Sequence, residues 1–465
     1  MSKYEPVSAE VVAALQTALG AEYVRTDAET LEKYKTDEET DPRYHHLPEV
    51  VIWPGSTEEV AAVMKIANRY NVPVTPRSAG TSVSCGAIPV YGGIVLLLER
   101  MDKIEELNTE GMYMVVEAGA RTVEIQEKAN AAGFLYAGDP CSADSCLIGG
   151  NIATNAGGNK AVRYGTTRDQ VYAIEAVTPT GDIVNVGARL KKKSTGYCLE
   201  QLIMGSEGTL GIITKATLKL LPLCPYKLDL LAIFTDLDKA VGLVPNLIKA
   251  GLNPTSVEFM DNAFVRSSSD YCELKLPHYE DGSYVIVTVE TFNEDELESK
   301  MEQLDEICSA SGATDVLEAD DRVWKLRRNC LESTRVLSLV STSDDLVVPV
   351  DQIANCIRHL TRVAENYNFK LFTLAHAGDG NLHFQILKGE MSDEQWEDEV
   401  SRFHAEAYPY VYSLGGRLSG EHGIGAKKVE AMEKYTEPVE MKMMKEIKRA
   451  LDPKNILNPG KVFNA

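Results

Sequence analysis

The sequence of 465 residues predicts an α+β fold with two or three domains, because it exceeds a single ordinary core and its pattern changes along the chain. Its first half alternates short apolar strands with amphipathic helices and carries three dense glycine clusters. Beyond a proline-bracketed stretch near residue 222, strands alternate with charged helices, which predicts a second domain built on an antiparallel sheet.

The N-terminal half begins with helical periodicity over residues 8–36 and continues as a βαβ-like pattern from residue 50. The expected buried positions of the first stretch are Val11, Val12, Leu15, Leu19 and Leu31. A helix is predicted over 57–70, where Val60, Val63, Met64 and Ala67 recur three and four residues apart. The strands expected around it span residues 50–53, 72–75, 94–98, 114–117 and 171–177.

The composition shifts at residues 220–231, where Pro222 and Pro225 bracket a short linker. A strand at 284–289 and a charged helix at 293–310 follow it. A last helix is predicted over 438–451, closed by the Asp452-Pro453 step, because the residue before a proline disfavours the helical region.

The net charge of −22 argues against nucleic acid or an anionic membrane as a partner, since both require basic patches. The nine cysteines are scattered, without a Cys-x-x-Cys pair, which favours free thiols in a reducing cytoplasm over disulfides or an iron–sulfur site. The N-terminus lacks the basic-then-apolar pattern of a signal peptide. We therefore expect a soluble cytoplasmic protein.

Three glycine clusters, at residues 76–86, 140–169 and 205–211, are the most informative feature of the sequence. Glycines remove side chains where a large ligand lies against the backbone, and freed amide groups in such turns form nests for phosphate oxygens. Neither a Walker A loop nor a Gly-x-Gly-x-x-Gly motif after a strand is present. One cluster would be read as tight turns, but three in this order predict one dinucleotide contacted at several points.

Two further motifs carry chemistry. In the first, Asp379-Gly380 predicts a two-residue hairpin turn that pairs His376 with His383, with Cβ atoms about 4.5–5.5 Å apart. In the second, residues 419–425 place Glu421 and His422 among glycines. Two histidines and a carboxylate form a common face for zinc, iron(II) or manganese. Each histidine alone is more often structural, and we interpret His404, in a polar helical stretch, in that way.

The glycine clusters and these two motifs resemble the D-2-hydroxy-acid dehydrogenases of the p-cresol methylhydroxylase and vanillyl-alcohol oxidase superfamily, over residues 48–461. The resemblance implies a PCMH-type FAD-binding domain of two α+β subdomains, an antiparallel substrate (cap) domain and a C-terminal helical segment. The implied boundaries are 1–45 for an N-terminal helical segment, 46–222 for the FAD-binding domain, 226–412 for the cap domain, and 413–465 for a segment returning to the flavin site.

The resemblance also implies where FAD is held. The loop matching residues 76–82 wraps the pyrophosphate, the loop matching 149–155 packs along the pyrophosphate and flavin, and the stretch matching 205–209 encloses the nucleotide. No histidine lies inside these motifs, so we expect FAD to be bound non-covalently. The residues expected to bind the cofactor are Pro76, Arg77, Ser78, Ala79, Gly80, Thr81, Ser82, Pro140, Ser142, Gly149, Gly150, Asn151, Ala153, Asn155, Gly157, Gly158, Tyr164, Gly165, Glu207, Gly208, Gly211, Ile212 and Asn458.

The family's metal falls on the positions of His376, His383 and Glu421, its catalytic base on His422, and its substrate-binding arginine on Arg327. Arg77 is an alternative partner for the substrate, but its place in the pyrophosphate loop gives it another role. Residues 341–345 lack the lysine with which D-2-hydroxyglutarate enzymes hold a distal carboxylate, which favours a small monocarboxylate such as D-lactate.

The implied reaction oxidises D-lactate to pyruvate, with hydride transfer to flavin N5 and electrons passed to an electron-transferring flavoprotein. A glycolate oxidase catalytic subunit or a D-2-hydroxyglutarate dehydrogenase, using an iron–sulfur partner or a quinone, is the alternative within the family. Two readings lie outside it. A metal-dependent hydrolase would leave the first 220 residues unexplained, and a non-catalytic flavin relay would not need Glu421, His422 or Arg327.

Overall fold

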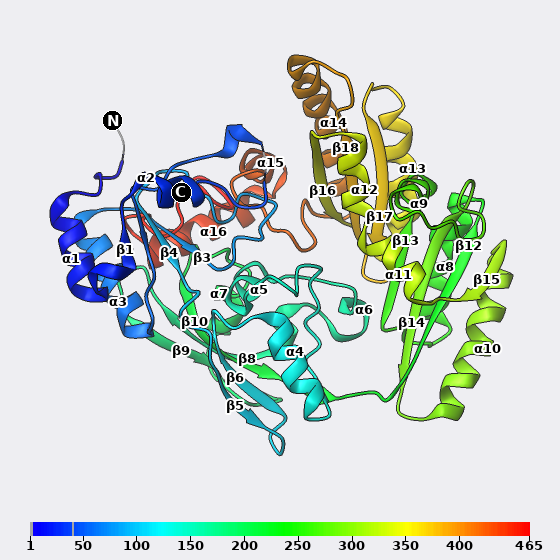
Figure 1. Cartoon of the computed structure of the whole chain (residues 1–465), viewed down its shortest axis with the longest axis horizontal. Coiled ribbons are helices and arrows are strands. Elements are labelled where there is room, and N and C mark those ends of the chain that lie inside the picture. Colours follow the sequence, from blue (N-terminus) through cyan, green and yellow to red (C-terminus); the bar gives the residue numbers. More distant parts are fainter. Residues whose placement is uncertain (1–2, 40) are drawn as a thin grey trace. The chain divides into compact units, whose positions relative to one another are not determined.

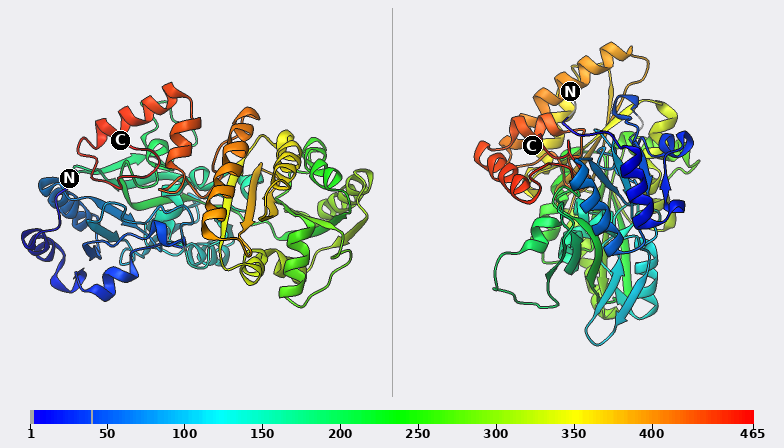
Figure 2. Two further views of the ribbon diagram at one scale, coloured as in Figure 1. Left: turned by 90° about the horizontal axis from the view of Figure 1, so that it is seen from above. Right: turned by 90° about the vertical axis from the view of Figure 1, so that its left-hand side faces the viewer.

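A computed structural model describes residues 3–39 and 41–465, so residues 1, 2 and 40 of the predicted N-terminal segment lie outside it. The chain divides into two compact units (Figures 1 and 2). The first comprises Met1–Gly157, Gly165–Leu223 and Glu421–Ala465, and the second comprises Gly158–Tyr164 and Cys224–Gly420. Among the described residues, no helix combines the length and the apolar character needed to cross a membrane.

The first unit contains a four-stranded sheet in the order β1-β2-β4-β3. Strands β2, β4 and β3 run parallel and β1 pairs antiparallel with β2. The predicted helix over 57–70 is confirmed as α3 (Thr57–Tyr70), with Ser56 as its N-cap and Asn71 in the left-handed conformation at its end. The other bounds are β1 Val24–Arg25, β2 Val50–Ile52, β3 Val74–Arg77 and β4 Ile94–Leu97.

The stretch over 8–36 is not one helical segment, which corrects the sequence-based expectation. It forms α1 (Ala9–Leu19) and α2 (Ala28–Lys33), separated by β1. Helix α1 ends because Gly20 adopts a positive φ of 95°, and Val24 then pairs with Ile52 of β2. A distant strand therefore overrides the local helical periodicity.

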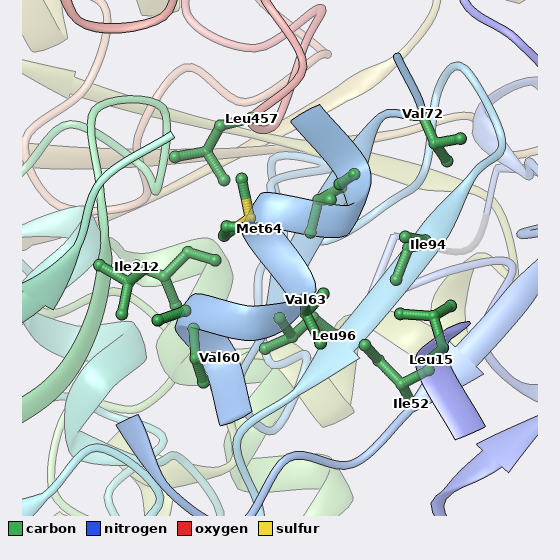
Figure 3. Close-up of a cluster of buried hydrophobic side chains, with 14 of the residues drawn as sticks. Leu15, Ile52, Val60, Val63, Met64, Val72, Ile94, Leu96, Ile212 and Leu457 are labelled. Atoms are coloured by element: carbon green, nitrogen blue, oxygen red, sulfur yellow. The ribbon is translucent and has the colours of Figure 1, made fainter. Parts of the chain in front are cut away.

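A hydrophobic core joins α3 to this sheet (Figure 3). Apolar side chains gather there because burial removes their surface from water. The residues labelled in the figure come from several elements: α1 (Leu15), α3 (Val60, Val63, Met64), the turn after α3 (Val72), the strands (Ile52, Ile94, Leu96), the start of β10, Ile212–Lys219 (Ile212), and the C-terminal segment (Leu457). The C-terminal segment is thus part of the first unit's core.

A five-stranded antiparallel sheet, in the order β5-β6-β10-β8-β9, completes the first unit. The predicted strand over 171–177 and helix over 438–451 are confirmed residue for residue, as β8 and α16. The bounds are β5 Ile104–Asn108, β6 Tyr113–Glu117, β7 Phe134–Leu135, β8 Val171–Val177, β9 Ile183–Gly187, β10 Ile212–Lys219, β11 Leu221–Pro222, α4 Thr122–Ala131, α5 Ile148–Thr154, α7 Leu199–Ile203, α15 Val429–Tyr435 and α16 Pro438–Leu451.

The second unit contains the predicted antiparallel sheet, seven strands in the order β15-β12-β14-β13-β17-β18-β16. The strands are β12 Tyr226–Phe234, β13 Ser256–Met260, β14 Ser283–Thr291, β15 Asp315–Glu318, β16 Ser341–Val347, β17 Lys370–His376 and β18 Asn381–Leu387. The helices are α6 Ala161–Tyr164, α8 Leu237–Lys249, α9 Asn262–Tyr271, α10 Glu294–Ala310, α11 Asp321–Arg328, α12 Cys330–Leu337, α13 Ile353–Ala364 and α14 Asp393–Ser413.

One face of this sheet packs against α9, α11 and α12. Its apolar part joins Ile286 of β14, Met260 of β13 and Leu374 of β17 to Phe264 of α9 and Leu326 of α11. Side chains alternate between the two faces along each strand. The register therefore places Glu258, His376, His383 and Asp345 on this same face.

Candidate active site

The turn between β17 and β18 corrects the predicted hairpin. His376 pairs with Asn381, and Leu374 pairs with His383, so the loop has four residues instead of two. The predicted pair of His376 with His383 is therefore wrong. The reason is that the N–H groups of Ala377 and Gly378 donate to the carbonyl of Val257 in β13, at 2.8 and 3.3 Å.

The two histidines nevertheless lie together, because a shift of two residues keeps each side chain on its face. The ring centroids of His376 and His383 are 5.3 Å apart, with the rings nearly perpendicular. One ligand nitrogen of each lies within 4.8 Å of the other. The second unit thus brings together the two histidines predicted to bind the metal.

A buried glutamate holds His376 and Arg327. Glu258 is fully buried and lies opposite His376 in the register of β13 and β17. One oxygen, Oε1, is 2.8 Å from Nδ1 of His376, and the other, Oε2, accepts from Nε and Nη2 of Arg327 at 3.0 and 2.7 Å. Burial opposes the charged form of Glu258, but His376 and Arg327 hold its pKa below the ordinary value. The predicted substrate-binding arginine is therefore anchored beside a predicted metal ligand.

A second buried carboxylate, Asp345, pairs with His383 across β16 and β18. One of its oxygens lies within 4.8 Å of a ring nitrogen of His383. Asp345 accepts from Nδ2 of Asn381 at 2.5 Å, from the hydroxyl of Ser419 at 2.6 Å and from the N–H of Gly420 at 3.1 Å. It therefore fixes the backbone that leads directly into Glu421.

On the opposite face of the sheet, Asp344 binds helix α14. It accepts from the hydroxyl of Tyr408 at 2.9 Å and lies 2.8 Å from Nε2 of His404. Asp344 and Asp345 point to opposite faces because side chains alternate along a strand. These contacts give His404 a partner that ties α14 to the sheet.

In the first unit, Glu421 and His422 belong to a loop fastened to the glycine clusters. Nε2 of His422 is 3.6 Å from Oε1 of Glu421. The hydroxyl of Ser84 donates to the carbonyl of His422 at 2.8 Å. A Cβ added at Gly157 would meet Oε2 of Glu421 at 2.8 Å, so only glycine leaves room for this carboxylate. The loop is thus hydrogen-bonded to the first cluster and packed against the second.

The three glycine clusters also meet one another within the first unit. A Cβ added at Gly150 would lie 3.1 Å from Cβ of Ser78, and one added at Gly208 would lie 2.9 Å from Cγ of Pro76. The N–H of Gly205 donates to the carbonyl of Ile152 at 3.0 Å. Segments far apart in the sequence therefore surround one place, as expected for one extended ligand.

The first cluster offers donors suited to an anion. The backbone N–H groups of Ser78, Ala79, Gly80 and Thr81 donate to no protein acceptor among the described residues. Gly80 has a positive φ of 79°, and a Cβ there would overlap the guanidinium of Arg77. Consecutive amides in a turn with one left-handed residue form a concave anion site. This arrangement fits the pyrophosphate of FAD.

Several residues predicted to bind the cofactor have side chains that support the fold. Glu207 accepts from the N–H groups of Ile424 and Gly425, both at 2.7 Å, and burial raises the pKa of its carboxyl. Asn458 donates to the carbonyl of Glu207 at 2.7 Å. Three others donate hydrogen bonds within the protein: Arg77 to the carbonyl of Thr36, Asn151 to Thr122, and Tyr164 to Glu290 in the second unit. Asn155 accepts hydrogen bonds from Thr166 and Arg168, and Ile212 is part of the hydrophobic core.

Sequence reasoning missed Glu258 and Asp345. Glu258 left one signal, a single charge in the strand Ser-Val-Glu-Phe-Met, since a charged residue is almost never fully buried unless it is paired. Asp345 left no such signal, because residues 341–345 are all polar and no single charge stands out among them.

Convergent glycine turns on an α+β unit, joined to an antiparallel sheet that carries the polar site, define a flavin-dependent oxidoreductase. Residues 48–187 match the family described as an FAD binding domain, and residues 227–462 match FAD linked oxidases, C-terminal domain. The chain belongs to the FAD-linked oxidase family.

Its relatives include a D-lactate dehydrogenase of Anaerostipes hadrus, 36% identical over 425 residues that cover 89% of each chain. The glycolate oxidase subunit GlcD of Bacillus subtilis (strain 168) is 35% identical over 427 residues, covering 91% of this chain and 90% of that one. Among solved structures, p-cresol methylhydroxylase with substrate bound has a TM-score of 0.83 at 17% identity, covering 97% of this chain and 96% of that one. This last likeness confirms the PCMH-type fold.

Proposed function

We propose that the protein oxidises a D-2-hydroxy acid, in the first place D-lactate, to the corresponding 2-oxo acid. The observation that carries this proposal is the pair His376 and His383 on one sheet face, with Arg327 of α11 linked to His376 through Glu258. This cluster joins two metal-type ligands to a cation for a carboxylate. The names of the D-lactate dehydrogenase and glycolate oxidase relatives support the same substrate class.

FAD, held non-covalently by the three glycine clusters, would supply the two-electron acceptor that the reaction requires. The amides of residues 78–81 suit its pyrophosphate. The close approach of Gly150 to Ser78 brings the second glycine cluster directly beside these amides. The remaining predicted cofactor residues would contribute through their backbones, because many of their side chains already serve the fold.

We further propose that His376, His383 and Glu421 hold one divalent metal ion, which would supply a Lewis acid for the substrate hydroxyl. Nδ1 of His376 faces Glu258, so Nε2 is the nitrogen that would bind the metal. Glu421 follows Gly420 directly, and Gly420 is bonded to Asp345, the register partner of His383. Mixed nitrogen and oxygen ligands accommodate zinc, iron(II) or manganese.

Two residues would act on the substrate itself. The guanidinium of Arg327 would pair with its carboxylate, which suits the planar fork of arginine. His422 would accept the proton of the α-hydroxyl at a ring nitrogen, as a general base. Residues 341–345 carry no cation for a distal carboxylate, which supports a small monocarboxylate over a dicarboxylate.

For the electrons, we propose an electron-transferring flavoprotein in the cytoplasm as acceptor. The scattered cysteines of this chain include no cluster for an internal iron–sulfur relay. A glycolate oxidase activity with an iron–sulfur subunit or a quinone is the second candidate, favoured by the likeness to the GlcD subunit.

The test is an anaerobic absorbance titration of the purified protein with D-lactate, L-lactate, glycolate and D-2-hydroxyglutarate. We expect the flavin band to bleach with D-lactate and not with L-lactate. Chelator-treated protein should keep its flavin band, lose the bleaching and recover it when zinc, manganese or iron(II) is added. A protein without a flavin band even after addition of FAD would overturn the cofactor assignment, and bleaching that survives chelation would overturn the metal.

A further inference from the structure

Glu258 has no role in the proposed function. It is fully buried, yet its carboxylate contacts the two groups on which the proposed chemistry depends. His376 is 2% exposed, and the side chain of Arg327 is 11% exposed. A charge buried this deeply persists only where its partners fully satisfy it.

The contact with His376 selects one form of the imidazole. An ionised carboxylate only accepts hydrogen bonds, so the Nδ1 that faces Oε1 must carry the proton. Nε2 then presents its lone pair on the side of the ring that faces away from Glu258. Glu258 therefore fixes both the tautomer and the orientation of this histidine.

The contact with Arg327 fixes the orientation of the guanidinium plane. Oε2 accepts from both Nε and Nη2, so the guanidinium cannot turn about its long axis without breaking two hydrogen bonds. Nη1 takes no part in this contact with Glu258, so it is the nitrogen that would meet a substrate carboxylate. Because one side chain makes both contacts, the distance between the imidazole and the guanidinium is set by a single carboxylate.

We propose that Glu258 is a positioning residue, which holds the metal-binding imidazole of His376 and the substrate-binding guanidinium of Arg327 in one fixed geometry. The inference rests on the proposed function for the roles of those two residues. It adds a group outside the predicted ligand and substrate set that governs metal affinity and substrate binding together.

The test replaces one residue, Glu258→Gln, in the full FAD-loaded chain. The glutamine keeps the volume, but it offers one acceptor oxygen and turns an NH2 group toward a donor. In chelator-treated protein, we expect the dissociation constant for Co²⁺, followed by its visible absorption, to rise about 10–100-fold. We expect KM for D-lactate to rise about tenfold or more, because Arg327 loses its orientation.

The matched control is Glu399→Gln, another buried glutamate, which accepts from Asn368 and Gln395. It should lower the thermal midpoint without changing Co²⁺ affinity or KM. If Glu258→Gln does not fold, Glu258→Asp keeps the charge but shortens its reach, and should shift both quantities in the same direction by less.

A change in both quantities with the control unchanged supports the proposal. A change in only one, or in neither, overturns it, since a shared carboxylate must affect both partners. The wild-type protein separates this outcome from failure of the proposed function. If the wild-type protein binds no Co²⁺ and its flavin band bleaches with no hydroxy acid, the proposed function is refuted. The positioning role of Glu258, which rests on that function, is then refuted as well.

Discussion

Replacing Gly150 with alanine should separate cofactor binding from folding. Gly150 lies in the first turn of α5, and a Cβ there would stand 3.1 Å from Cβ and 3.3 Å from Oγ of Ser78. Its neighbour Gly149 is the matched control, because a Cβ there would stand 2.7 Å from Cβ and 2.9 Å from the carbonyl oxygen of Ala118. One methyl group would press on the first glycine cluster, whose amides are expected to hold the pyrophosphate, and the other would enter the packed interior.

The magnitudes follow from these contacts. Alanine is more favourable than glycine in a helix by about 0.5–1 kcal/mol, and the contact requires Ser78 to move by only a few tenths of an ångström. The Gly150→Ala protein should therefore be about as stable as the wild type. Gly149→Ala forces a contact with backbone, and overpacking of this kind costs about 1–3 kcal/mol. That variant should be the less stable of the two.

The assay compares thermal unfolding of the FAD-free proteins with the affinity for FAD, measured by quenching of flavin fluorescence. Gly150→Ala should keep the wild-type midpoint and lose about tenfold in affinity, which corresponds to about 1.4 kcal/mol. Gly149→Ala should show a lower midpoint. Unchanged FAD affinity in a stable Gly150→Ala protein would refute the placement of the FAD pyrophosphate where α5 meets the first glycine cluster.

Three further predictions concern single side chains. His422→Asn should suppress flavin reduction by D-lactate while FAD stays bound, and near-normal reduction in stopped flow would remove His422 from the role of base. Asp345→Asn leaves at least one of three donors without an acceptor, which should cost about 1–3 kcal/mol and slow turnover, as followed by unfolding and steady-state rates. Burial raises the pKa of Asp261 to about 7 from 3.8. The folded state then keeps a proton that the unfolded chain releases, so stability should fall as pH rises from about 4 to about 7, and Asp261→Asn should reduce this slope in pH-dependent unfolding.

The elements that were predicted closely owe their form to local patterns. The helix over residues 57–70 has its apolar stripe, its Ser56 cap and its terminal Asn71 within one short stretch of sequence. The strand pairing that shortened the first predicted helical stretch is not local, because β1 pairs with a strand more than twenty residues later. Periodicity contains no information about such a partner.

The residues of the candidate site also differ in whether the local sequence predicts them. Glycine clusters and histidine motifs are visible because each needs several unusual residues close together in the sequence. Glu258 is a single residue, more than sixty positions from Arg327 and more than a hundred from His376. Its role arises only when β13 pairs with β17 and α11 packs on that sheet face. A partner supplied by tertiary structure has no motif of its own.

The hairpin shows why a wrong register still gave the correct pair of histidines. The side-chain period of a strand is two, so a slip of two residues moves His383 along the strand and leaves it on the same face as His376. A slip of one residue would have turned one ring to the face of Asp344 and α14, away from the other histidine. The expectation that survived was the alternation of faces, a property of strand geometry. The expectation that failed depended on which carbonyl, 120 residues away, accepts from the turn.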